Sequence, residues 1–95
     1  MNIRQAFALA LRKARKARGL TQEDFSIVSS RTYLSALERG MKSPTLDKVQ
    51  ELADTLKVHP LTLLALAYSN IEGENGLSAL MDKIKLEIMG LNPKS

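Results

Sequence analysis

Cysteine and tryptophan are absent from the chain, and aromatic residues make up only 4% of it. Without cysteine there is no disulfide, no thiol nucleophile and no cysteine-ligated zinc site. The low aromatic content disfavours a β-sandwich or barrel, because those folds are rich in aromatic and β-branched residues. The longest uninterrupted apolar run, Leu63 to Tyr68, is far too short to cross a membrane, and no signal peptide is visible. We therefore expect a cytoplasmic protein without a membrane segment.

The residues that the chain does contain are typical of one small helical domain. It has 95 residues, 44% of them hydrophobic and 25% charged, which is enough for a single core. Leucine, alanine and lysine dominate, and all three favour helices. The single histidine, His59, precedes a proline and is interpreted as a helix cap rather than a metal ligand. No glycine-rich phosphate loop or catalytic constellation is present, so we expect no enzymatic activity, cofactor, metal or small-molecule ligand.

Charge is distributed unevenly along the chain. Residues 1–43 contain nine lysines and arginines against three acidic residues, whereas residues 44–95 contain five against seven. No acidic residue precedes Glu23. A basic N-terminal half is typical of proteins that bind a polyanion, with nucleic acid as the first choice and an anionic membrane surface as the second. On charge alone, a solvated helix face without a partner remains the alternative.

The spacing of apolar residues predicts six helices and no strand. The first three predicted helices cover residues 2–18, 22–28 and 31–39. The fourth ends near residue 56, and the fifth and sixth cover residues 60–69 and 77–89. Thr21 and Ser30 stand at the N-cap positions of the second and third helices. The fourth helix is capped either by Ser43, with a proline following it, or by Thr45.

The apolar stripes of these helices predict one shared core. Ile3 begins the stripe of the first helix, and Leu46 begins that of the fourth. The fifth helix is apolar on nearly all sides, so we expect two of its sides to be covered. A linker at residues 72–76 separates it from the sixth helix, which Gly90 is expected to end.

The second and third predicted helices form a pair of short helices joined by a tight turn. The outer face of the third helix consists of Arg31, Thr32, Ser35, Ala36 and Arg39. Arginine combined with small side chains is unusual for a helix face that is merely solvated. Such a face is compact enough to enter the major groove of DNA, as the second helix of a helix-turn-helix unit does.

These residues resemble the Cro/lambda-repressor type of helix-turn-helix domain, also called Xre-like. The matching stretches are 19–25, 30–40 and 43–46, followed by the pair Leu52-Ala53, and the resemblance covers roughly residues 3–69. It implies an all-α, lambda-repressor-like domain of five helices over residues 1–70, with a linker and an additional C-terminal helix over 71–95. The chain departs from the family between Gln22 and Arg31, where the spacing is shorter than usual and the turn glycine is missing.

The resemblance also implies roles for individual residues. Arg31, Thr32, Ser35 and Ala36 occupy the base-reading positions, where an arginine can pair with guanine. The positions that hold phosphate in the family are occupied by Thr21, Gln22, Arg39, Lys42 and Ser43. Tyr33 either reaches phosphate through its hydroxyl or only packs. Arg15 and Glu38 are expected to form a structural bridge between the first and third helices.

We therefore expect a sequence-specific transcriptional regulator that binds double-stranded DNA. One domain of this size makes few contacts, so we expect a homodimeric repressor on a palindromic operator. The expected dimerisation faces are the surplus apolar surface of the fifth helix and the apolar stripe of the sixth, namely Leu77, Leu80, Met81, Ile84 and Ile88. The rival interpretation is that this helix folds back on the fifth helix of its own chain.

Two other classes of function remain open at this point. The first is a protein–protein module, such as an antitoxin or the partner of another regulator. The absence of a long disordered tail argues against the antitoxin. The second is a membrane-surface anchor through the basic first helix. That helix has an alanine-rich apolar face with a single aromatic residue, Phe7, so we rank this class last.

Overall fold

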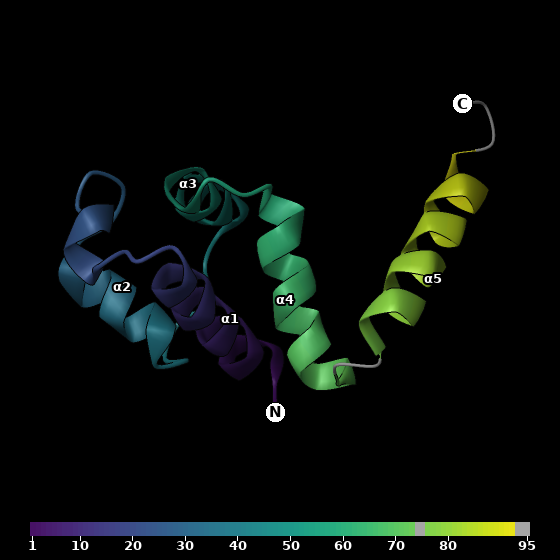
Figure 1. Ribbon diagram of the computed structural model, residues 1–95, viewed down its shortest axis with the longest axis horizontal. Helices are drawn as coiled ribbons and strands as arrows, with labels where there is room; N and C mark the ends of the chain where they lie inside the picture. The colour runs from purple at the N-terminus through teal and green to yellow at the C-terminus, as the bar shows by residue number, and fades with distance from the viewer. Residues whose placement is uncertain (74–75, 93–95) are drawn as a thin grey trace.

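The computed structural model describes residues 1–73 and 76–92, and within them it contains helices and no strand (Figure 1). The elements are α1 (Ile3–Ala17), the short 3-10 helix η1 (Gln22–Phe25), α2 (Arg31–Glu38), α3 (Leu46–Leu56), α4 (Pro60–Glu72) and α5 (Gly76–Leu91). This confirms the predicted all-α, lambda-repressor-like fold with an additional C-terminal helix. Residues 74–75 of the predicted linker, and residues 93–95, lie outside the described residues.

Helix α1 is the centre of the domain. Figure 1 shows it between α2 and α4, and it packs against both, while α3 packs against α4 and η1. The largest fully buried side chains are Phe25, Leu11, Leu34, Leu37, Leu52, Leu56 and Leu63. Each contributes about 1.5–3 kcal/mol through burial, so this set forms the centre of the core. All of its members lie within residues 1–70, and α5 adds none.

Polar caps begin the helices at the predicted positions. The side chains of Thr21 and Ser30 accept hydrogen bonds from the first turns of η1 and α2. Of the two candidates for α3, Thr45 is the cap and Ser43 is not. His59 caps α4, because its Nδ1 accepts the Leu61 amide at 3.0 Å. Helices η1, α2 and α4 therefore start where the sequence indicates, and the structure decides the start of α3.

Several predicted boundaries and faces differ from the structure. Instead of a helix over 22–28, η1 ends at Phe25 and the chain turns directly into α2. Gly90 does not end the last helix, which runs on to Leu91. Ile3 and Leu46 were expected to face the core but are exposed, Leu46 at 82%. Both are the first residues of their helices and lie beyond the edge of the core.

Two side-chain hydrogen bonds to the main chain tie distant segments to this core. Arg18 Nε donates to the Leu56 carbonyl at 3.0 Å, which holds the end of α3 against the end of α1. Asn70 Nδ2 donates to the Ala6 carbonyl at 3.0 Å, which holds α4 along α1. Gly40 has φ +72, and a Cβ there would meet the main chain of α1 at 3.5 Å. Glycine at this position lets the chain leave α2 in a left-handed conformation.

Helix α5 stands apart from this arrangement. Its main neighbour is α4, and none of its residues is buried. Figure 1 shows α5 on the far side of α4 from the helix-turn-helix unit. None of the helices described is both long and apolar enough to cross a membrane.

Candidate nucleic-acid interface

Helix α2 presents its N-terminal end to solvent. Its inner face is fixed by Leu34 and Leu37, which are completely buried. Arg31 and Thr32 are exposed in the first turn, and Ser35 is half-buried one turn later. Base edges are met by the N-terminal residues of the second helix in a helix-turn-helix unit, and Arg31 and Thr32 are exposed at that end of α2.

The prediction that Ala36 lies on the outer face is wrong. Its exposure is only 7%. After α2 the chain turns back at Gly40, and the Met41 amide donates to the Ala36 carbonyl at 3.0 Å. The methyl group of Ala36 is too short to project beyond the chain at Gly40 and Met41. The outer face of α2 is therefore narrower than the sequence indicated, with Arg31, Thr32 and part of Ser35 at its centre.

An ion pair holds α2 against α1. The Nε and Nη2 atoms of Arg15 donate to the two carboxylate oxygens of Glu38 at 2.7 and 2.9 Å. Arg15 Nη1 also donates to the Leu20 carbonyl at 3.1 Å. Glu38 is 3% exposed and Arg15 is 14% exposed, so the pair is shielded from water. The hydrogen bond to Glu38 raises the pKa of Arg15, aided by the charge of the carboxylate and opposed by burial.

Gln22 joins the same network from η1. Its Nε2 donates to Glu38 Oε1 at 3.2 Å, so one carboxylate connects α1, η1 and α2. Thr21, beside it, is engaged in a capping box in which its hydroxyl and amide both donate to Asp24 Oδ2. Gln22 therefore braces the recognition helix, and Thr21 fixes the start of the helix that precedes it.

The shortened turn between η1 and α2 closes without a glycine. The amides of Val28 and Ser29 both donate to the Phe25 carbonyl, at 3.0 and 2.9 Å. Lys57 is the one non-glycine residue with positive φ in the described part of the chain, and it lies outside the turn. Lys48 of α3 donates its ammonium to the Val28 carbonyl. The turn thus uses ordinary backbone conformations and a side chain from another helix, which sequence reasoning missed.

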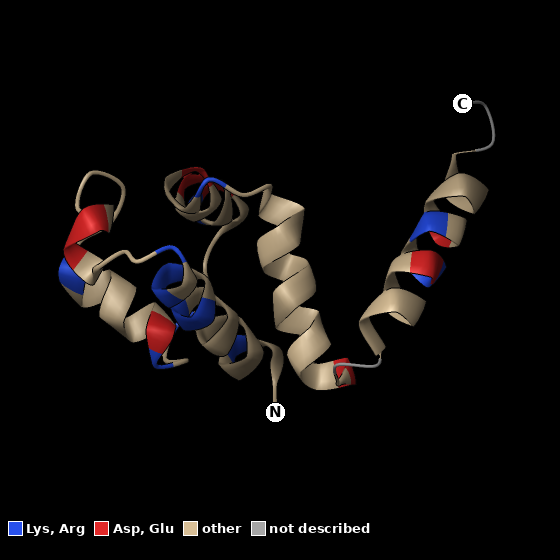
Figure 2. Cartoon of the chain, viewed as in Figure 1, with Lys and Arg blue, Asp and Glu red and all other residues tan. Residues whose placement is uncertain are grey.

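Two lysines flank the aromatic ring of α2. Lys42 Nζ and Lys48 Nζ each lie 5.7 Å from the centroid of the Tyr33 ring, which is half-buried. Such contacts are favourable and hold the positive charges beside the recognition helix. Lys42 and Ser43 are exposed, as is Arg39, whose Nε donates back to the Ser35 carbonyl at 3.3 Å. Figure 2 shows lysine and arginine gathered on α1 and at both ends of α2.

A family model described as helix-turn-helix matches residues 11–63, which include η1, the turn and all of α2. The chain belongs to the helix-turn-helix family, in its Cro/lambda-repressor branch. This helix-turn-helix protein is 38% identical over 66 residues to the HTH-type transcriptional regulator y4dJ of Sinorhizobium fredii. That similarity covers 67% of the chain and 86% of y4dJ. Membership in this family supports a DNA-binding regulator of transcription.

Two crystal structures of the clp gene regulator ClgR from Corynebacterium glutamicum are similar to this helix-turn-helix protein. One has a TM-score of 0.69 and 28% identity, and covers 74% of this chain and 94% of ClgR. The other has a TM-score of 0.71 over 99% of this chain and 98% of ClgR. At 24% identity, the second likeness shows the fold alone. The relatives named here are transcriptional regulators rather than enzymes.

Proposed function

We propose that this protein regulates transcription by binding a palindromic DNA operator as a homodimer, and that it represses by occupying that operator in the cytoplasm. The observation that carries the proposal is α2, a capped helix with exposed Arg31 and Thr32 at its N-terminal end. Its inner face is locked to the core through Glu38. Because α2 is already held in place, its entry into the major groove of DNA does not add the entropy cost of ordering the helix.

Base readout and phosphate binding fall to different residues. Arg31 donates to guanine O6 and N7, and Thr32 and Ser35 contact neighbouring bases or a thymine methyl group. The phosphate backbone on either side is held by Arg39, Lys42 and Ser43 after α2, by the Tyr33 hydroxyl, and by Thr21 and Gln22 at η1. Lys48 adds positive charge beside Tyr33.

The dimer assigns separate tasks to two segments of the chain. Residues 1–70 form the DNA-reading domain, and 71–95 form the linker and dimerisation helix. The expected dimerisation stripe is open in the single chain. Leu77, Met81, Ile84 and Ile88 are exposed, and Leu80 is half-buried. Two domains related by a two-fold axis double the contacts and read half-sites about 34–36 Å apart.

Selection of bound duplexes from a random DNA library tests this function. We expect enrichment of one inverted repeat whose half-sites are about one helical turn apart. Binding to the selected site should weaken steeply with salt, because phosphate contacts release counterions. A matched duplex with both half-sites scrambled is the control. Equal affinity for the two duplexes, or no salt dependence, would exclude a sequence-specific DNA-binding role.

A further inference from the structure

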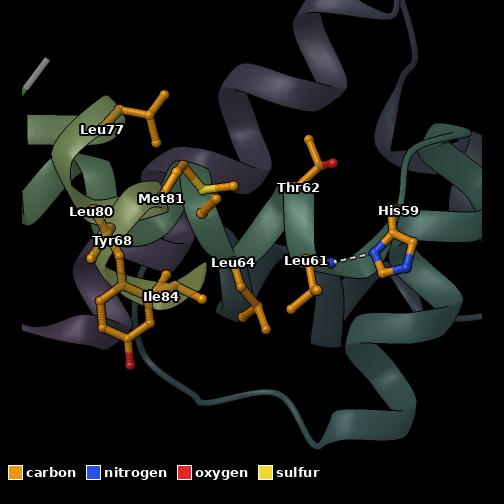
Figure 3. Close-up of a pocket in the computed structure, with 10 residues that line it drawn as sticks. His59, Leu61, Thr62, Leu64, Tyr68, Leu77, Leu80, Met81 and Ile84 are labelled. Atoms are coloured by element: carbon orange, nitrogen blue, oxygen red, sulfur yellow. Dashed lines mark hydrogen bonds between the residues drawn. The ribbon is translucent and has the colours of Figure 1, made fainter. Parts of the chain in front are cut away.

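An apolar groove of about 710 Å³ runs between α4 and α5. Leu61, Leu64 and Tyr68 line it from α4, and Leu77, Met81 and Ile84 line it from α5. Figure 3 shows these side chains projecting from the two helices around a common space. His59, at one end, has its Nδ1 committed to capping α4. The other polar side chains that line the groove are those of Thr62 and Tyr68, so its lining is almost entirely apolar.

The distal half of α5 has apolar side chains that no described part of the chain covers. Beyond the groove, Ile88 is 58% exposed and Leu91 is 85% exposed. Both follow Ile84 at helical spacing, so they continue the apolar face of α5 that lines the groove. One chain thus has both an open apolar groove and an exposed apolar helix end.

We propose that the groove is filled by the distal half of α5 from a second copy of this chain. Each copy inserts Ile88 and Leu91 beside α4 of the other, so that α4 and α5 of both copies form an intermolecular four-helix bundle. This deepens the homodimer of the proposed function and rests on it. It also goes beyond the expectation that both helices take part, because it assigns the distal half of α5 of one copy to the groove of the other.

The extent of the exposed apolar surface matches a dimer interface. Eight large apolar residues that share these faces of α4 and α5 are exposed, namely Leu61, Tyr68, Ile71, Leu77, Met81, Ile84, Ile88 and Leu91. Together they expose roughly 800 Å², which is about what a stable interface needs from each partner. The largest apolar patch on a typical monomer is only about 300–600 Å².

Charge also favours a second copy as the occupant. The charged residues of α5 are Asp82, Lys83, Lys85 and Glu87, two of each sign. Residues 1–43, in contrast, contain nine basic and three acidic residues. Two copies that meet through α4 and α5 bring neutral surfaces together. Their basic halves, which repel one another, remain apart on the side that DNA occupies.

Two experiments on the full chain test the inference. The first measures mass in solution for Ile84→Glu and for the matched control Leu46→Glu, an exposed apolar residue outside the groove. A glutamate buried without a partner should raise the dimer dissociation constant at least about 100-fold, with helicity unchanged. The control should remain dimeric. A monomeric wild-type chain, or a dimeric Ile84→Glu variant, would overturn the proposal.

The second experiment uses the absence of cysteine, which makes every disulfide in a variant an engineered one. Variants with one cysteine at position 61, 64 or 68 are mixed with variants that have one cysteine at 88 or 91. Disulfides that form between the two sets can only join different chains, and they require Cα atoms within about 7 Å. We expect them in the mixtures. Disulfides confined to pairs of distal α5 positions would show that the helices meet outside the groove.

The outcomes separate this inference from the proposed function. If a palindrome is selected from random DNA but no groove-to-helix disulfide forms, the operator-binding role stands and the bundle is wrong. If the disulfides form but no duplex is selected, the bundle stands and the DNA-binding role fails.

Discussion

Breaking the ion pair between Arg15 and Glu38 is expected to cost far more stability than breaking an exposed pair. Arg15→Met keeps much of the aliphatic length but removes both hydrogen bonds to Glu38 and the one to the Leu20 carbonyl. The Glu38 carboxylate then stays buried, with the Gln22 amide as its side-chain partner. Removing one partner of a buried pair costs about 3–5 kcal/mol, against roughly 0.2–1 kcal/mol for an exposed pair.

This loss is large compared with the whole stability of a small domain, which is about 5–15 kcal/mol. For a urea m-value of about 1–3 kcal/mol/M, a loss of about 3 kcal/mol lowers the unfolding midpoint by roughly 1–3 M. Urea unfolding followed by circular dichroism measures it. The neighbouring Lys16→Met variant is the control, because Lys16 is exposed and should change the free energy of unfolding by less than about 0.5 kcal/mol.

A double-mutant cycle decides whether the two residues act as a pair. Replacing both Arg15 and Glu38 by methionine removes both charges, so the double variant should recover much of the loss seen in Arg15→Met. We expect a coupling energy of at least about 1.5 kcal/mol. A coupling near zero would refute the reasoning, because the single-variant cost would then come from packing.

The raised pKa of Arg15 sets how this stability depends on pH. Since the folded pKa lies above the unfolded one, the contribution of Arg15 is complete below the unfolded pKa. It is lost only as the pH rises through the folded pKa. Unfolding free energies measured at neutral and at moderately alkaline pH should therefore show the same coupling energy between Arg15 and Glu38.

Three further outcomes are expected. Arg31→Ala should cost about 1–3 kcal/mol of discrimination between operator and scrambled duplex at one salt concentration while keeping most non-specific binding; equal losses on both duplexes would make Arg31 a phosphate contact. Lys48→Met should cost about 1.5–3 kcal/mol in urea unfolding, because the Val28 carbonyl loses a charged donor, whereas the exposed Lys16→Met should cost little. Removing residues 76–95 should leave a folded monomer with weakened operator binding, because the core contains no α5 residue; an unfolded product in circular dichroism, or a persistent dimer in solution, would contradict this.

Local features of the fold could be predicted from the sequence because they depend on neighbouring residues. The caps Thr21 and Ser30 accept hydrogen bonds from amides three residues later, and the buried leucines of α2 repeat at helical spacing. The identity of the α3 cap stayed open, because Ser43 and Thr45 both satisfy the local pattern. Only the structure shows that Thr45 receives the Lys48 amide.

Most contacts that depend on tertiary packing were missed, and the bridge between Arg15 and Glu38 was expected only through the family resemblance. The side chains of Lys48, Arg18 and Asn70 each donate a hydrogen bond to a distant carbonyl. The donor and the acceptor are 20, 38 and 64 positions apart in the sequence, respectively. No periodicity or cap signal marks such contacts, since they depend on how the helices pack. Ala36 was misplaced for the same reason, because its burial depends on the path of the chain after Gly40 and not on its place in the helical repeat.

The exclusion of α5 from the core lets two properties of the regulator evolve independently. In the proposed dimer, residues 31–39 determine which bases are preferred, while residues 76–91 determine which chain is accepted as a partner and how far apart the half-sites stand. A substitution in α5 does not disturb the buried leucines that hold α2, so a change of partner need not alter base preference. Two related chains with compatible α5 helices and different α2 residues would then pair with each other and recognise an asymmetric operator.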